Sequence, residues 1–165
     1  MPQSRALPTI PFIILGIFEP ALLLYSYLIH IHSPWAYYSI QAPQSPLPPI
    51  PSAASFPAQA EGTTIQLVNL FIVLSIAGAF CSFSKDAVTV KGFLVAYGIG
   101  DFGHIWAIYK ALGPVAFWDT GVWNEAVWGG MGVSVLFAVT RWGTLAGLFG
   151  RVGGREPEVG KGKGE

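Results

Sequence analysis

Four long apolar runs alternate with shorter polar stretches along the chain. They cover about residues 10–31, 64–83, 90–112 and 124–149. A helix rises 1.5 Å per residue, so a run of about 20 apolar residues crosses the ~30 Å hydrocarbon core of a bilayer. The pattern therefore predicts an all-α integral membrane protein. We expect residues 1–150 to form a four-helix transmembrane bundle.

The first run raises the question of a cleaved signal peptide. Arg5 supplies a positive flank, but Glu19-Pro20 interrupts the apolar core and no small-residue cleavage site follows. We therefore expect a retained helix. Because proline removes one backbone hydrogen bond, this helix should be kinked near Pro20.

The stretch between the first two runs has a different composition. Seven of the 13 prolines lie between Pro34 and Pro57. Such a segment favours extended, polyproline-like conformations, so residues 33–62 are predicted to form a long exposed loop. Its aromatic start, with Trp35 and Tyr38, suits a membrane interface.

The remaining connections are shorter. Ser84-Lys85-Asp86 links the second and third runs, and a tryptophan-rich segment that is typical of headgroup depth links the third and fourth. The Gly-, Lys- and Glu-rich residues 151–165 are predicted to be a disordered cytoplasmic tail.

Composition and charge agree with a lipid environment. The chain is 52% hydrophobic and only 11% charged, against about 25% charged in ordinary soluble domains. A formal net charge of zero provides no general attraction for nucleic acid. The single Cys81 excludes a disulfide framework and a thiolate metal cluster. We expect the bilayer as the main partner, no nucleic acid and no cofactor, and the oligomeric state stays open.

Basic residues predict the orientation. With four spans, both termini and the loop between spans two and three share one side. That side carries most of the basic residues, namely Arg5, Lys85, Lys91, Arg151, Arg155, Lys161 and Lys163. By the positive-inside rule both termini are predicted to be cytoplasmic. The endoplasmic reticulum or another endomembrane is the expected location.

The third run carries two polar residues near its middle, Asp101 and His104. They are three residues apart and so lie on one helical face. Glu19 in the first run and Arg141 in the fourth are their candidate partners. Charged groups at such depth are costly and often serve function, so these residues form a candidate catalytic cluster. The structural alternative is a polar network of Asp101, His104 and Arg141 that fixes helix register.

A second polar group lies near the start of the fourth run. Asp119 is a further member of the candidate cluster, and Trp106, Trp123 and Asn124 are candidate pocket-lining residues. For Asn124 and the neighbouring Glu125, helix capping is the favoured interpretation, because polar side chains satisfy free N–H groups at a helix start.

Two further motifs favour a structural interpretation. Gly98, Gly100 and Gly103 match a dinucleotide-binding G-x-G-x-x-G, but they lie inside an apolar run without strand–helix alternation, so helix packing is favoured. Asp101 and His104 with Glu19 or Asp119 offer a single-metal site, but no repeated Glu-x-x-His motif supports it, and no metal is expected.

Two segments carry a family resemblance. The run GDFGHIWAIYKALG and the later FWDTGVWNEAVWGGMGVSVLFAVTRWG resemble a family of small fungal four-span membrane proteins of unknown function. Its recurring features fall on Gly100, Asp101, Gly103, His104, Trp123, Asn124, Trp128, Gly129 and Arg141. The resemblance implies a four-span fold and a membrane location, but it implies no particular reaction, because the family has no assigned activity. A looser architectural similarity to sterol isomerases rests on acidic groups, a histidine and tryptophans in an apolar setting.

Three functional hypotheses follow. The favoured one is a non-enzymatic membrane subunit or lipid-organising protein with an intramembrane polar network. The second is a protein that binds a lipophilic small molecule, or an acid-catalysed isomerase or cyclase of an isoprenoid or sterol-like substrate, with Glu19 and Asp101 as general acids and His104 as proton shuttle. The third is proton or solute translocation, which four spans without an internal repeat do not favour.

Overall fold

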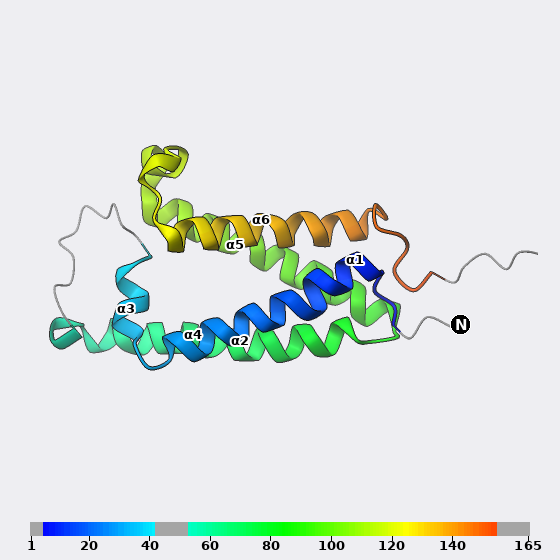
Figure 1. Ribbon diagram of the computed structural model, residues 1–165, viewed down its shortest axis with the longest axis horizontal. Coiled ribbons are helices and arrows are strands. Elements are labelled where there is room, and N and C mark those ends of the chain that lie inside the picture. The colour runs from blue at the N-terminus through cyan, green and yellow to red at the C-terminus, as the bar shows by residue number, and fades with distance from the viewer. Residues whose placement is uncertain (1–4, 42–52, 155–165) are drawn as a thin grey trace, which may run out of the picture.

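The computed structural model describes residues 5–41 and 53–154, and all regular structure within these residues is helical (Figure 1). This confirms the predicted all-α class. The elements, in chain order, are α1 (Thr9–Pro11), the π-helix η1 (Phe12–Phe18), α2 (Glu19–His30), α3 (Pro34–Ser39), the 3-10 helix η2 (Ala53–Ser55), α4 (Ala58–Ser82), α5 (Ala87–Trp118), the 3-10 helix η3 (Thr120–Val122) and α6 (Glu125–Leu145).

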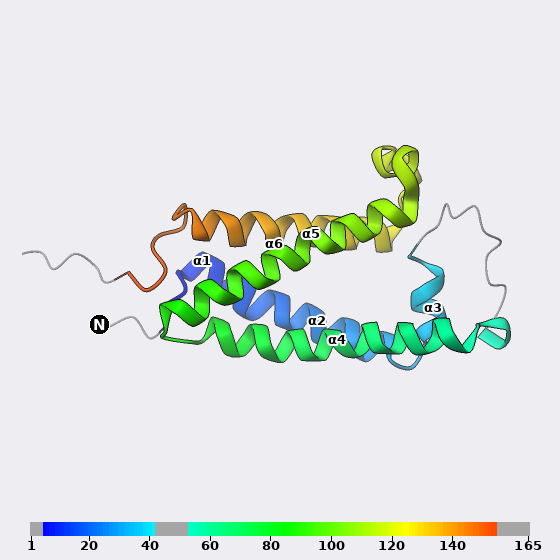
Figure 2. The same cartoon turned by 180° about the vertical axis from the view of Figure 1, so that it is seen from behind.

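The long helices form two pairs. The continuous helix α1–η1–α2 packs against α4, and α5 packs against α6. The pairs meet at the end of the molecule where α4 turns into α5, through contacts of α4 with α5 and of α1 and η1 with α6. Toward the other end the two pairs diverge, and α3 lies there (Figures 1 and 2).

The first helix contains a π-helical segment where the sequence predicted a kink. The N–H of Glu19 donates to the carbonyl of Ile14, five residues earlier. Proline at position 20 lacks an N–H, and its ring crowds the carbonyl four residues before it. The wider π-helix, which ends just before Pro20, accommodates this crowding without ending the helix. The Pro20 carbonyl in turn accepts a hydrogen bond from Ser75 Oγ at 2.8 Å.

The prediction of an unbroken loop over residues 33–62 is wrong at both ends. Pro34 is the first residue of α3, and Pro57 is the N-cap of α4. Proline is tolerated in the first turn of a helix, where an N–H would have no partner, so here two prolines begin helices. The centre of the predicted loop, residues 42–52, lies outside the described residues.

Helix α3 packs onto the first helix pair through Tyr37. Its ring lies edge-on to Phe71 of α4, with 5.9 Å between the centroids, and 4.5 Å from the ring of His30. Burial raises the pKa of Tyr37 to about 12. The aromatic start of the predicted loop is thus part of the packed structure.

Helix α5 changes direction at Gly113, close to the predicted end of the third run. Gly113 has φ 78° and ψ 166°, a conformation that is essentially restricted to glycine, and Pro114 follows it. The ribbon bends sharply there, next to the connection to α6 (Figure 1). Helix α6 ends at Leu145, so the fourth helix is shorter than predicted.

Two helices are long and apolar enough to cross a membrane, Thr9–His30 and Ala58–Ser82. They give weak support for membrane association, because this support comes only from the length and composition of the two helices. Spans over residues 90–112 and 124–149 stay predictions. The tail expected at residues 151–165 lies outside the described residues from position 155 onward.

The glycine-packing prediction holds for one of the residues in the G-x-G-x-x-G match. A Cβ on Gly98 would lie 3.1 Å from the indole of Trp142 on α6, whereas Gly100 and Gly103 face no atom within 4 Å. In the fourth helix, Gly143 approaches Phe149 of its own C-terminal turn instead of another helix.

Candidate functional site

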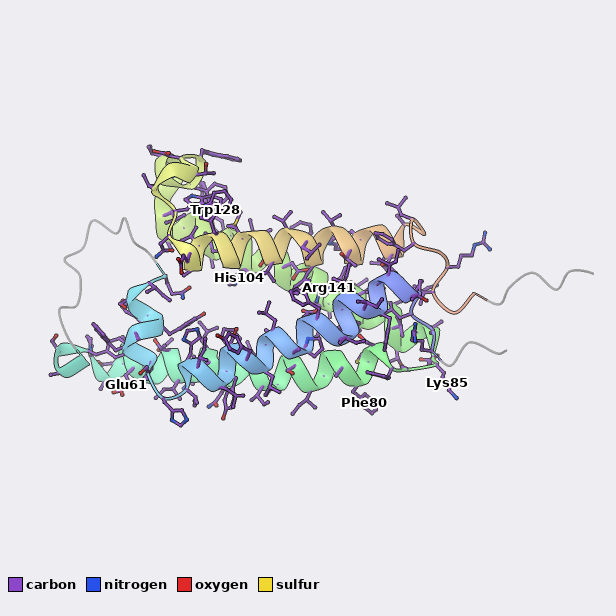
Figure 3. The ribbon with its side chains drawn as sticks, in the orientation of Figure 1. Glu61, Phe80, Lys85, His104, Trp128 and Arg141 are labelled. Carbon is purple, nitrogen blue, oxygen red and sulfur yellow. The ribbon has the colours of Figure 1, made fainter. Side chains whose placement is uncertain are left out.

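A completely buried arginine connects the two helix pairs. Arg141 of α6 has no solvent-exposed surface. Its Nη1 donates to Asp101 Oδ2 on α5, and its Nη2 donates to both carboxylate oxygens of Glu19 on α2. We call Glu19, Asp101 and Arg141 the charge triad. Arg141 is labelled in Figure 3, on the side of α6 that faces the other helices.

Local structure explains why Glu19 reaches Arg141. Glu19 is the first residue of α2, directly after the π-helix, and is 5% exposed. A π-helical turn rotates the residues after it relative to those before it, and such turns occur frequently at functional sites. The π-helix also brings Gly16 so close to α4 that a Cβ there would lie 2.8 Å from Ser82 Cβ. The segment that carries Glu19 is thereby held against α4.

Aromatic rings surround the guanidinium group. The Arg141 Cζ lies 5.3 Å from the ring centroid of Tyr97, 5.4 Å from that of Phe137 and 5.8 Å from that of Phe93. These distances allow cation–π attraction. The Tyr97 hydroxyl is engaged elsewhere, since it donates to the Leu74 carbonyl at 2.9 Å. The triad therefore lies in an environment from which water is largely excluded.

The triad contains two carboxyl groups and one guanidinium group. With both carboxyls ionised it carries one negative charge, and with one proton bound it is neutral. The guanidinium stays charged at any pH that a protein experiences. Its remaining donor, Nε, is buried and has no hydrogen-bond partner among the described residues. The arrangement can thus hold one proton internally, but its carboxylates are occupied by Arg141.

His104 does not join this network, contrary to the predicted network of Asp101, His104 and Arg141. A Cβ on Gly130 of α6 would lie 3.3 Å from His104 Nε2. Gly130 lies about three helical turns from Arg141, about 16 Å along α6. His104 makes no hydrogen bond to another described residue and is exposed. Figure 3 places it between Trp128 and Arg141. Glu19 takes the place in the network that was expected for the histidine.

The second polar group lies at the opposite end of α6. Asp119 is exposed, and its Oδ1 accepts a hydrogen bond from the Gly121 N–H at 3.1 Å, so it caps η3. Asn124 caps α6 by accepting from the Val127 N–H at 2.9 Å. Its Nδ2 donates to the Ile40 carbonyl at the end of α3, also at 2.9 Å. These polar groups therefore have local structural roles and lie apart from the triad.

The tryptophans belong to an aromatic cluster near the bend of α5. Trp123 Nε1 donates to the Ala116 carbonyl at 3.0 Å, and its ring lies 4.9 Å from that of Trp128. Trp106 is 56% exposed and stacks on Tyr109. Neither Trp106 nor Trp123 contacts the guanidinium group.

Sequence reasoning missed the aromatic residues that surround the Arg141 guanidinium group. Phe93, Tyr97 and Asp101 recur every four residues along α5, so they share one helical face. That spacing was a signal that could have identified them. Phe137 likewise precedes Arg141 by four residues on α6.

Within residues 5–41 and 53–154, no three metal-ligating side chains gather. A surface hollow lies elsewhere, at the end of α4, lined by Ala79, Phe80, Phe83 and Ser84.

The fold and the triad define a class: an all-helical protein with two membrane-compatible helices and a buried charge network that joins its helix pairs. The chain belongs to the family described as Domain of unknown function (DUF7704), whose family model matches residues 4–151. No curated protein and no solved structure shows significant similarity to the chain.

Proposed function

We propose that the protein is a non-enzymatic integral membrane protein with four spans, acting as a membrane subunit or a lipid-organising protein. The charge triad serves in it as an internal connector that sets how the two helix pairs are joined. Residues 9–30, 58–82, 87–112 and 125–145 are the proposed spans.

The observation that carries this proposal is the complete burial of Arg141 between Glu19 and Asp101. A catalytic acid must reach a substrate, yet both carboxyl groups are hydrogen-bonded to one buried side chain. The hollow at the end of α4 contains neither of them. Buried ion pairs add little net stability but can specify one arrangement of helices, which suits a connector.

Charge distribution supports two cytoplasmic termini. Exposed or partly exposed basic residues gather where α4 turns into α5, namely Arg5, Lys85, Lys91 and Arg151. The N–H of Ala6 donates to the Ser84 carbonyl and that of Gly153 to the Ala6 carbonyl, so the first and last described segments meet at this end. The opposite end carries Glu61, Asp119 and Glu125 and only one lysine, Lys110. The positive-inside rule then puts the basic end in the cytoplasm.

Topology is tested with single cysteines in a Cys81→Ser background. The vesicles used have the cytoplasmic face of the membrane on the inside. In them, Lys85→Cys is expected to react with an impermeant maleimide only after the vesicle membrane is opened. Gly121→Cys is expected to react in sealed vesicles. Equal labelling of both positions in sealed vesicles would overturn the four-span topology.

The connector role is tested by neutralising the whole triad. The triple variant Glu19→Gln, Asp101→Asn, Arg141→Met removes all charge while keeping similar side-chain volumes. If the triad is a connector, a folded triple variant retains the cellular role of the protein, read as the lipid profile or growth of a host that lacks its own copy. If the carboxyls act as general acids, the folded triple variant loses that role completely.

His104 favours one alternative, binding of a lipophilic small molecule at the exposed surface of α5 beside Gly130 of α6. It is exposed, unlike the triad, and has no hydrogen-bond partner among the described residues. A ligand with a hydroxyl or carbonyl group would bind to its ring. Under this alternative, His104→Leu abolishes retention of a co-purifying lipophilic molecule in extracts analysed by mass spectrometry, whereas Ile99→Leu does not. Identical extracts from both variants would exclude it.

A further inference from the structure

From the surface at the end of α4 we infer a binding site for one anionic phospholipid. Its acyl chain would lie in the hollow of Ala79, Phe80, Phe83 and Ser84, and its phosphate would bind Lys85 and Arg5. This inference rests on the proposed membrane location. The site is separate from the charge triad and requires no role for it.

The hollow has an apolar wall and a polar rim. Phe80 and Phe83 are 77% and 59% exposed, which is high for aromatic side chains. Ser84 ends the hollow, and Lys85 follows it in the turn to α5. Phe80 and Lys85 both project outward from this end of α4 (Figure 3). An acyl chain followed by a headgroup has the same order of apolar and polar surface.

Arg5 is held beside the hollow by aromatic contacts. Its guanidinium lies 3.8 Å from the ring centroid of Phe12. The Phe12 ring lies edge-on to Phe83, with 4.9 Å between the centroids, and Phe83 lines the hollow. The contacts hold the guanidinium close to the rim before any ligand binds, and this pre-organisation lowers the entropic cost of binding.

The basic groups at this site lack acidic partners. No ion pair involves Arg5 or Lys85 in the part of the chain that the structure describes. Arg5 Nε is buried without a hydrogen-bond partner, and one Nη donates only a long bond of 3.4 Å to Thr9. Asp86, the residue after Lys85, forms no ion pair among the described residues, and its carboxylate accepts two hydrogen bonds from Thr89. The positive charges of Arg5 and Lys85 are therefore not engaged in ion pairs among the described residues.

Charge complementarity identifies the occupant as an anionic phospholipid. A zwitterionic headgroup brings its own cation, which would be repelled by Lys85 and Arg5. Cytoplasmic leaflets carry anionic lipids, and basic residues close to the membrane surface bind them. A free phosphate ion would use the same donors but would leave the apolar hollow empty.

The test uses photocrosslinking to the full-length protein in phosphatidylcholine vesicles. One probe is phosphatidylglycerol with a diazirine in its acyl chain, and the matched probe is phosphatidylcholine with the same chain. The expected result is selective labelling of residues 79–84 by the anionic probe. Each basic residue near the surface contributes roughly a fivefold change in anionic lipid binding, so Lys85→Ala should lower this labelling about fivefold.

The controls separate the site from general attraction to the membrane. Lys85→Arg should retain the labelling, and so should Lys110→Ala at the opposite end. Equal labelling by the two probes, or unchanged labelling in Lys85→Ala, would overturn the inference. So would loss of labelling on addition of inorganic phosphate at constant ionic strength, because the site would then bind the free ion.

Labelling of other positions distinguishes this inference from the proposed function. Ile76 and Val139 are 64% and 62% exposed and lie inside proposed spans. If neither probe labels them, the membrane-spanning proposal itself fails. If both probes label them and residues 79–84 show no preference for the anionic probe, only the lipid site fails.

Discussion

Arg141 Nη2 donates to both carboxylate oxygens of Glu19, although 122 positions separate the two residues in the sequence. The same guanidinium binds Asp101 through Nη1. One side chain therefore joins α6 to its partner α5 and to α2 of the other helix pair. The planar fork of arginine suits this geometry, because its two Nη groups can serve two carboxylates at once.

Removal of the guanidinium should be strongly destabilising. Arg141→Met leaves two carboxyl groups buried without a counter-ion, and breaking a buried pair in this way costs about 3–5 kcal/mol. Arg141→Lys should recover little, because a single ammonium group cannot reproduce two forked contacts. The thermal midpoint of the purified protein in detergent, followed by circular dichroism, measures the loss.

A matched variant separates charge imbalance from lost packing. The triple variant Glu19→Gln, Asp101→Asn, Arg141→Met removes the charges together, so it should be markedly more stable than Arg141→Met alone. If both variants lose the same stability, the guanidinium acts through its packing against Phe93, Tyr97 and Phe137 and not through charge.

The sequence predicted the long helices well because apolar length is a local property. The first helix was expected at residues 10–31 and is found at Thr9–His30. The loop boundaries were poorly predicted, because the effect of proline depends on its position. Proline is favourable at the start of a helix but disrupts the interior of a helix. Pro34 and Pro57 both lie at helix starts. Composition alone cannot distinguish these two cases.

The structure brings together three of the eight candidate site residues. The cost of burying charge singled out Glu19, Asp101 and Arg141. Which of them meet depends on how the two helix pairs are aligned, and that alignment follows from contacts between the pairs, such as the hydrogen bond from the Tyr97 hydroxyl on α5 to the Leu74 carbonyl on α4. His104 was included because it lies one turn from Asp101, yet one turn is enough to place it against Gly130. The π-helix before Pro20 was not foreseen, since no sequence rule specifies it.

The close approach of η1 to α4 predicts a strong effect of Gly16→Ala. The added Cβ would lie 2.8 Å from Ser82 Cβ and 3.0 Å from the Phe12 ring, so α4 must move away. Overpacking of this kind typically costs about 1–3 kcal/mol. A thermal melt in detergent measures the change.

Gly62→Ala in α4 is the matched control for Gly16→Ala. A Cβ at Gly62 meets no atom within 4 Å. Alanine is the better helix former by about 1 kcal/mol, so this variant should be as stable as the parent protein or more so. Equal losses from both substitutions would contradict the close packing of η1 on α4.

Asn124 has two separable roles, and two substitutions distinguish them. Asn124→Ala removes the cap of α6, at a cost of about 1 kcal/mol, together with the bond to Ile40. Asn124→Asp keeps an oxygen for the Val127 N–H but has no amide to donate to Ile40. In hydrogen exchange, Asn124→Asp should accelerate exchange in α3 while the first turn of α6 stays protected. Asn124→Ala should accelerate exchange in both, and protection of α3 in both variants would contradict the connection.

Asp86 predicts a pH dependence at the start of α5. The Thr89 N–H and hydroxyl both donate to Asp86 Oδ2, at 2.8 and 2.7 Å, and these bonds lower the pKa of the carboxyl group. A folded-state pKa below the unfolded value of about 3.9 means that the carboxylate stabilises the fold above that pH. This stabilisation is lost as the pH falls through the folded-state pKa.

Asp86→Asn isolates that contribution, because asparagine caps a helix without titrating. Other carboxyl groups titrate in the same range, so the informative quantity is the difference in thermal midpoint between the parent protein and the variant. That difference should be constant from neutral pH down to about pH 4 and should shift in favour of Asp86→Asn below it. Lys85→Gln, at the neighbouring exposed position, should follow the parent curve in this acidic range. A difference that stays constant down to the lowest pH would show that the cap of α5 does not depend on the charge of Asp86.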